Sequence, residues 1–139
     1  MIKLTHVADL SVVAGGPIDA GETPAGACRV IPIPGGTVTG TGLKGQVMSG
    51  GADFRILRKD GVTEPEARYI IVTESGSKIY VENKGLRRGE PVDAALICFR
   101  ATPRFETADE KYRRLTRHIF LCDGVRRPNR VELAFCQVM

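Results

Sequence analysis

The sequence contains no tryptophan and only two histidines, His6 and His118, which lie far apart. The four cysteines are Cys28, Cys98, Cys122 and Cys136. None of them forms a Cys-x-x-Cys pair, and zinc ribbons and fingers need such close pairs to form a chelate. We therefore predict no metal site. Three of the cysteines stand inside apolar runs, which favours small buried thiols in a reducing cytoplasm over disulfides.

Long apolar runs are also missing, since none approaches the roughly 18 residues that a membrane-spanning helix needs. An acidic residue, Asp9, stands close to the N-terminus, and the sequence there lacks a basic n-region followed by a cleavage site. We therefore expect no secretory signal. The chain has 139 residues, 42% hydrophobic and 26% charged. This balance predicts one globular domain over residues 1–139. Without an expected membrane span or secretory signal, we predict that the protein is cytoplasmic and not bound to a membrane.

An excess of positive charge is present but uneven. The formal net charge is +4, and the stretch from Lys84 to Arg130 holds twelve Lys or Arg against six Asp or Glu. A basic half could contact nucleic acid. Single-strand binders, however, interleave basic residues with stacking aromatics, and this stretch does not. We therefore expect no nucleic-acid partner, and interpret the charge as a solvated surface with a few arginines that hold anions.

Alternation of apolar and polar residues dominates the chain, with Gly and Pro between the alternating runs. The predicted strands are Leu4–Val13, Arg29–Ile33, Thr37–Thr39, Lys44–Met48, Asp53–Arg58, Arg68–Glu74, Lys78–Lys84, Ala94–Ala101, Arg117–Cys122 and Arg130–Val138. The glycine-rich stretch from Gly15 to Gly26 is predicted as a loop. One short helix is predicted from Thr107 to Thr116, because Thr107 and Glu110 fit a capping box.

Many strands and a single helix predict an all-β, mainly antiparallel fold. We predict a small closed β-barrel of about eight to ten strands, because closure removes exposed strand edges. The run Gly40-Thr41-Gly42-Leu43-Lys44-Gly45 matches the dinucleotide fingerprint G-x-G-x-x-G. That fingerprint works only where it opens a helix. Here Gln46 to Gly51 cannot form one, so we interpret the glycines as a barrel corner and predict no cofactor.

Several runs carry a family resemblance. They are Ile33-Pro34-Gly35-Gly36-Thr37, Gly42-Leu43-Lys44-Gly45, Gly50-Gly51-Ala52-Asp53-Phe54, Ala67-Arg68-Tyr69, Ile79-x-Val81-x-Asn83-x-Gly85 and Phe99 to Thr107. In this order the chain resembles the uncharacterised family known as domain of unknown function 3237. The resemblance implies a small β-barrel and little about activity. The sequence departs from the family pattern at Phe54, where Trp is usual, and at Arg114-Leu115-Thr116, where Trp-Leu-Asn is usual.

Arg100 is the first candidate site residue. Its predicted strand is apolar on both faces, and a buried guanidinium needs an anionic partner. We predict that Arg100 is buried, borders the main cavity and pairs with Asp53 or Glu106. A purely structural ion pair is the alternative interpretation.

Asp53 and Glu106 are the candidate catalytic groups, because a partly desolvated carboxylate at a barrel mouth can carry a proton. Alternation does not decide whether Asp53 faces the inside of the barrel. If the Phe54 face is the core, Asp53 caps the preceding turn instead. Arg68 and Tyr69 open a strand and could bind a ligand oxygen or close a loop. Asn83 continues the apolar face of its strand, where an amide needs a partner from the protein or from a ligand.

These residues predict a barrel that binds a small organic molecule with an oxygenated or anionic group. The leading hypothesis is a cofactor-free acid/base enzyme of the isomerase, cyclase or lyase type. In it, Asp53 and Glu106 shuttle a proton, while Arg68, Tyr69, Asn83 and Arg100 bind the substrate. The alternatives are a non-catalytic ligand-binding barrel and a structural subunit of a homo-oligomer.

Overall fold

The computed structural model describes residues 1–89 and 98–139. Its strands are β1 (Leu4–Val13), β2 (Ile18–Thr23), β3 (Gly26–Ile33), β4 (Gly36–Thr39), β5 (Gly45–Val47), β6 (Gly51–Leu57), β7 (Thr63–Glu64), β8 (Glu66–Thr73), β9 (Lys78–Arg88), β10 (Cys98–Thr107), β11 (Phe120–Arg126) and β12 (Arg130–Val138). The first half of the expected strand 94–101 lies outside the described residues. The stretch predicted as a loop before Gly26 contains β2, whose hairpin with β3 is open to solvent.

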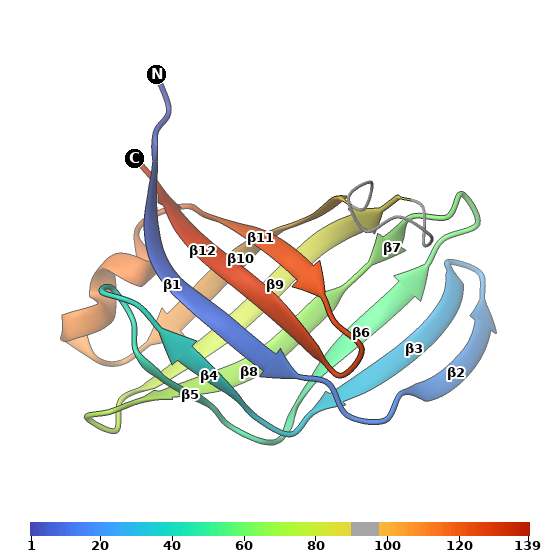
Figure 1. The fold of residues 1–139 in the computed structure, drawn as a ribbon, viewed down its shortest axis with the longest axis horizontal. Coiled ribbons are helices and arrows are strands. Elements are labelled where there is room, and N and C mark those ends of the chain that lie inside the picture. The colour runs from blue at the N-terminus through green and yellow to red at the C-terminus, as the bar shows by residue number, and fades with distance from the viewer. Residues whose placement is uncertain (90–97) are drawn as a thin grey trace.

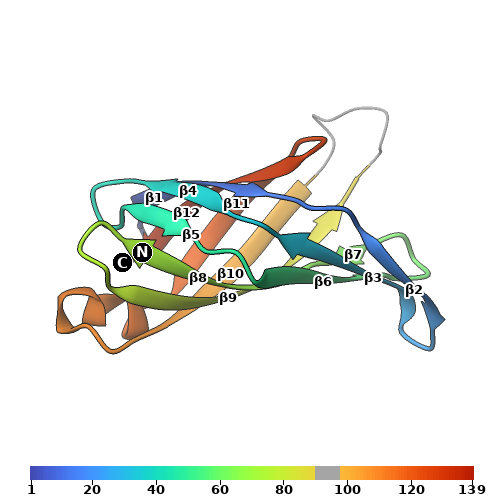
Figure 2. The same cartoon turned by 90° about the horizontal axis from the view of Figure 1, so that it is seen from below.

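The described strands form one antiparallel sheet in the order β10-β11-β12-β1-β4-β5-β8-β9-β7-β6-β3-β2. β9 also pairs with β10 along ten residue pairs, from Arg88 opposite Cys98 to Ile79 opposite Thr107. This pairing closes the sheet on itself. The prediction of a closed antiparallel barrel with one helix is thereby confirmed. The β2–β3 hairpin and the helix lie at opposite ends of the molecule (Figures 1 and 2).

Strand β10 runs further than predicted and includes Pro103, which has no N–H to donate. Beyond Ala101, only β9 pairs with β10, because the described β11 pairing covers Arg100 and Ala101 alone. One side of the strand therefore needs no donor at this point, which is the setting in which strands tolerate proline.

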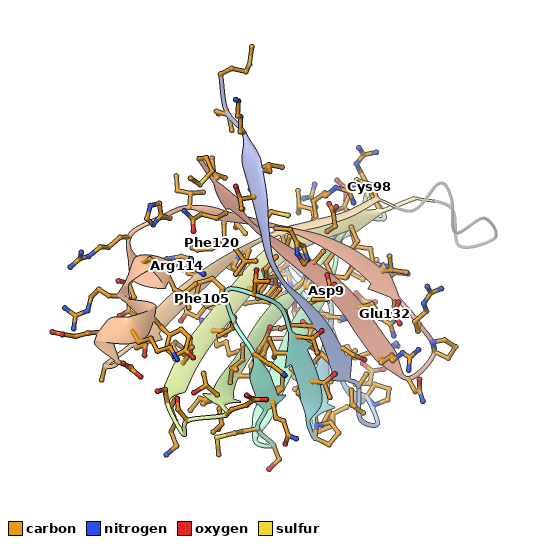
Figure 3. All side chains as sticks on the ribbon, turned by 60° about the vertical axis from the view of Figure 1, so that its left-hand side comes forward. Asp9, Cys98, Phe105, Arg114, Phe120 and Glu132 are labelled. Carbon is orange, nitrogen blue, oxygen red and sulfur yellow. The ribbon has the colours of Figure 1, made fainter. Side chains whose placement is uncertain are left out.

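The aromatic part of the core lies at the end of the barrel that is nearest the helix. Phe105 lies edge-on to Phe120 and Phe135, with ring centroids 5.0 and 5.7 Å apart. Both geometries are the T-shaped arrangement that aromatic rings prefer. Figure 3 shows Phe105 and Phe120 among the strands on the same side of the molecule as Arg114 of the helix. Leu115 of the helix is buried against this cluster, so the helix covers one end of the barrel.

The helix η2 (Glu110–Thr116) differs from the predicted one in type and start. It is a 3-10 helix, and its N-cap is Asp109, whose side chain accepts a hydrogen bond from the Lys111 backbone N–H. Thr107 instead ends β10, and its hydroxyl accepts from the Asp109 N–H. The prediction of a capping box at Thr107 is therefore wrong. The Asp109 carboxylate, one residue before the helix, has the capping role that was expected of the Thr107 hydroxyl.

The G-x-G-x-x-G run lies between β4 and β5, and a strand follows it, as predicted. A Cβ atom at Gly40 would contact the Val7 carbonyl oxygen, and one at Gly45 the Val72 carbonyl oxygen. These glycines thus permit close backbone approach at a barrel corner. Within residues 1–89 and 98–139, the structure has no helix with the length and apolar character that crossing a bilayer requires.

Candidate functional site

A small cavity lies inside the barrel, between the aromatic core and the open end. Its wall is mostly apolar, with Val12, Ile31, Ile33, Phe99, Ala101, Val131 and Leu133 among its lining residues. Its volume of about 40 Å³ is well below the roughly 150 Å³ of a protein cavity that binds benzene. The enclosed space therefore admits only the tip of an organic ligand, whose remainder would extend toward the open end.

Three predicted site residues lie on this cavity: Asp53, Tyr69 and Asn83. The register explains their meeting, because Ala67 of β8 pairs with Asp53 of β6 on one side and Asn83 of β9 on the other. Directly paired residues of antiparallel strands share a face. Asp53 and Asn83 thus stand at one level of the barrel, separated by the small side chain of Ala67.

Asp53 is held in a buried ion pair with Arg55. The Arg55 Nε donates to Asp53 Oδ2 at 2.6 Å, and the Glu66 backbone N–H donates to Asp53 Oδ1 at 3.0 Å. The Asp53 side chain is only 12% exposed and the Arg55 side chain only 8%. A charged group in such a place needs a partner of opposite charge and further hydrogen bonds. This environment keeps the carboxylate fixed in position at the cavity wall.

Two polar atoms of the cavity wall have no hydrogen-bond partner among the described residues: the Tyr69 hydroxyl and Asn83 Oδ1. Burial, and secondly the neighbouring Cys122 thiol, raises the pKa of Tyr69, so its phenol stays neutral and can donate. The Asn83 amide uses its Nδ2 for a long hydrogen bond to Cys122 Sγ, 3.8 Å away. Unpaired buried polar atoms are costly and rare. The cavity wall therefore holds one donor and one acceptor whose hydrogen-bonding capacity is unused by the described residues.

The prediction for Arg100 is wrong. Its side chain is 63% exposed and pairs with Asp123 at 3.0 Å on the outside of the barrel. Its neighbours Phe99 and Ala101 are buried, so alternation places Arg100 on the outer face. The sequence favoured burial because Leu96 and Cys98 share the face of Arg100 in the predicted strand. Apolar residues do not mark the inner face here, since exposed apolar side chains, Leu86 and Leu121 among them, line the outer groove around Arg100.

Arg68 and Glu106 also lie on the outer face, against the role predicted for them. Arg68 pairs with Glu66 at 2.8 Å and with Glu82 at 3.4 Å. Glu106 is exposed and stands opposite Tyr80 of β9. Each is one residue from an inward-facing neighbour, Tyr69 or Phe105. The predicted proton shuttle between Asp53 and Glu106 is therefore impossible, because the barrel wall separates the two carboxylates.

The sequence reasoning missed Arg55 and Arg87. Arg55 shares the Asp53 face of β6, and Phe54 on the opposite face is 46% exposed. Arg87 continues the inward row of β9 that contains Val81 and Asn83. Alternation could have identified both arginines. If Asp53 and Asn83 point into the barrel, then Arg55, two residues after Asp53, and Arg87, four residues after Asn83, point inward as well.

Comparison with known proteins places the chain in a family. The family model described as protein of unknown function (DUF3237) matches residues 2–138. The chain belongs to this family. A UPF0311 protein of Bradyrhizobium diazoefficiens is 44% identical over an alignment of 145 positions, gaps included, that covers 96% of this chain and 95% of that protein.

Solved structures share the barrel of this DUF3237 protein. A Rhodopseudomonas palustris protein of unknown function has a TM-score of 0.94 at 39% identity, covering 100% of this chain and 99% of the other. A structure described as an enzyme from Penicillium herquei has a TM-score of 0.78 at 21% identity, covering 99% and 95%. At that identity the likeness is one of fold alone.

The two departures from the family pattern lie away from the cavity. Phe54 points outward from β6. Arg114 is in η2, and its Nη2 donates to the Gly42 carbonyl oxygen at 3.2 Å, at the end of the barrel opposite the β2–β3 hairpin. Neither residue lines the cavity, so these departures do not alter the wall that a ligand would contact.

Cys122, beneath Asn83, should resist alkylation in the folded protein. Burial raises the pKa of its thiol to about 12, and only the thiolate reacts. With iodoacetamide at pH 8, we expect the half-buried Cys28 to be labelled in the folded protein and Cys122 only in denaturant, as followed by peptide mass mapping. Equal labelling rates for Cys28 and Cys122 in the folded state would show that this layer of the barrel is open to solvent.

Proposed function

We propose that this protein is a cofactor-free acid/base enzyme of the isomerase, cyclase or lyase type that acts on an oxygenated organic substrate. The observation that carries the proposal is the combination of a fixed carboxylate and two unpaired polar atoms on one apolar cavity. Asp53 supplies the carboxylate, and Tyr69 and Asn83 supply the polar atoms. Such a constellation matches the needs of proton transfer next to a substrate oxygen.

The simplest reaction compatible with this geometry is proton transfer at the carbon beside a carbonyl group. Asp53 removes the proton from that carbon, and the electron pair moves onto the carbonyl oxygen. The neutral Tyr69 phenol donates a hydrogen bond to the oxygen as negative charge develops. Return of the proton from Asp53 to another atom of the substrate completes an isomerisation. Asp53 is the sole carboxylate lining the cavity among the described residues, so one group both takes and returns the proton.

Asn83 and Arg55 have supporting roles in this proposal. The Asn83 Oδ1 accepts a hydrogen bond from a hydroxyl of the substrate, which fixes the orientation of the molecule. Arg55 is a positioning residue, because it holds Asp53 through a 2.6 Å hydrogen bond. The barrel fold can carry catalysis, as the Penicillium herquei structure described as an enzyme illustrates for its own protein.

One observation favours a second candidate, a non-catalytic ligand-binding barrel. Both oxygens of Asp53 already accept hydrogen bonds, from Arg55 and from the Glu66 backbone. A carboxylate engaged at both oxygens serves equally well as part of a rigid wall. A carrier needs the unpaired atoms of Tyr69 and Asn83 but no proton transfer.

The two candidates differ in a direct experiment with a neutral ketone, methyl 6-oxoheptanoate. Loss of its proton signals beside the ketone is followed by NMR in heavy water, with binding followed in the same samples. If the protein is an acid/base enzyme, it accelerates the exchange, and Tyr69→Phe lowers the rate about 10²-fold, the typical loss for one donor to an oxyanion. Glu106→Gln is the matched control, because that carboxylate lies outside the barrel, and it should leave the rate unchanged. Binding without exchange would assign the protein to the carrier class, and loss of exchange in Glu106→Gln would refute the proposed site.

A further inference from the structure

Four arginines meet at the open end of the barrel, beyond the cavity. Arg29, Arg55, Arg87 and Arg126 line a basin of about 480 Å³ at the base of the β2–β3 hairpin. They come from four different strands: β3, β6, β9 and β11. Arg55 borders both the cavity and the basin, so the two spaces share one wall. Figures 1 and 2 show this end of the molecule opposite the helix.

Two arginines of the basin face each other across neighbouring strands. Arg29 of β3 stands directly opposite Arg55 of β6, an arrangement that like charges ordinarily disfavour. Asp19 and Glu22 also line the basin. Among the described residues, neither of these acids forms an ion pair with an arginine, and the ion pair of Arg55 is with Asp53. The basin therefore concentrates positive charge that the described side chains neutralise only in part.

Arg87 provides the second observation. Its Nε is buried and has no hydrogen-bond partner within the described residues. Burial, and secondly the charge of Arg55, lowers the pKa of Arg87, because both disfavour its positive charge. A guanidinium with a buried, unpaired N–H group is stabilised by an anion that accepts two parallel hydrogen bonds. Carboxylates have this geometry.

We infer that the basin is a carboxylate-binding subsite, in which Arg87, supported by Arg126 and Arg29, receives the acid group of the ligand. This inference rests on the proposed function, since the oxygen of the same ligand occupies the cavity at Tyr69 and Asn83. The substrate class is then a slim organic acid with a carbonyl or hydroxyl group at the end remote from its carboxylate.

The spacing of the two subsites sets the length of the ligand. Arg87 follows Asn83 by four residues on β9, which places their Cα atoms about 13 Å apart at roughly 3.3 Å per residue. The arginine side chain shortens this span by reaching back toward the cavity. The enclosed volume of about 40 Å³ accepts the oxygenated tip, and the acid group extends into the wider basin.

The test compares 6-oxoheptanoate with its methyl ester, which differ in the charge of the acid group. Dissociation constants are measured by NMR titration at constant ionic strength. We expect the acid to bind about tenfold or more tightly than the ester, the range of a charge-assisted hydrogen bond. Arg87→Met should remove this preference by weakening the binding of the acid, and Arg126→Gln should reduce it. Arg100→Met is the control, because Arg100 pairs with Asp123 outside the barrel, and it should keep the full preference.

Equal affinity for the acid and the ester would overturn the inference, as would no binding of the acid at all. So would an acid preference that survives Arg87→Met or disappears in Arg100→Met. The outcome is separable from that of the proposed function. If Tyr69→Phe abolishes proton exchange but Arg87→Met leaves the preference intact, the catalytic proposal stands and the carboxylate subsite falls. If Arg87→Met removes the preference and no exchange occurs, the subsite stands on a carrier.

Discussion

Replacing Asp53 with alanine should destabilise the fold by about 3–5 kcal/mol, which is the usual loss when one partner of a buried ion pair is removed. The variant leaves the Arg55 guanidinium, only 8% exposed, without its carboxylate. It also removes the acceptor for the Glu66 N–H. A domain of this size has a total stability of roughly 5–15 kcal/mol, so much of the folding free energy depends on this one side chain. Urea denaturation of both proteins measures the difference.

The exposed pair of Arg100 and Asp123 is the matched control. Both side chains are more than 60% exposed, and exposed pairs contribute about 0–1 kcal/mol. Asp123→Ala should therefore change the unfolding free energy by less than about 1 kcal/mol. The double variant Asp53→Leu with Arg55→Met should recover much of the stability lost in Asp53→Ala, because apolar residues can replace a buried pair. Equal losses for Asp53→Ala and Asp123→Ala would contradict the buried position of Asp53.

Phe135→Ala should cost about 3–5 kcal/mol, as large aromatic truncations in a core do. Phe135 is fully buried on β12 and packs edge-on against Phe105. The variant removes both the buried apolar surface and the aromatic contact, and leaves a cavity that the rigid barrel strands cannot close. Thermal and urea unfolding followed by circular dichroism measure the loss.

Phe54→Ala provides the comparison on the opposite face of the wall. Phe54 is 46% exposed, and surface substitutions usually change stability by no more than about 0.5 kcal/mol. This comparison also tests the site, because Phe54 and Asp53 occupy opposite faces of β6. A loss in Phe54→Ala as large as that in Phe135→Ala would mean that Phe54 faces the core. Asp53 and Arg55 would then lie outside the barrel.

The alternating runs and the glycine and proline positions were sufficient to predict the fold class. Strand identity follows from local periodicity, and closure follows from the cost of free edges. The same reasoning missed β2, whose residues are exposed on both faces and therefore carry no alternation. It also placed the helix cap at Thr107, because Thr107 and Asp109 are both residue types that cap helices. Only the structure shows that Thr107 still belongs to β10, which leaves Asp109 as the cap.

The sequence alone also singled out three residues that line one cavity in the structure, Asp53, Tyr69 and Asn83. Only the tertiary structure decided which face of each strand points inward. Alternation divides a strand into two faces without naming the inner one, and a barrel with apolar residues on its outside removes the usual signal. Arg100 was assigned to the core for this reason, whereas Arg55 and Arg87 were passed over. A one-residue change of face moves a side chain through the barrel wall, so the position of each charge is settled by strand register rather than by local sequence.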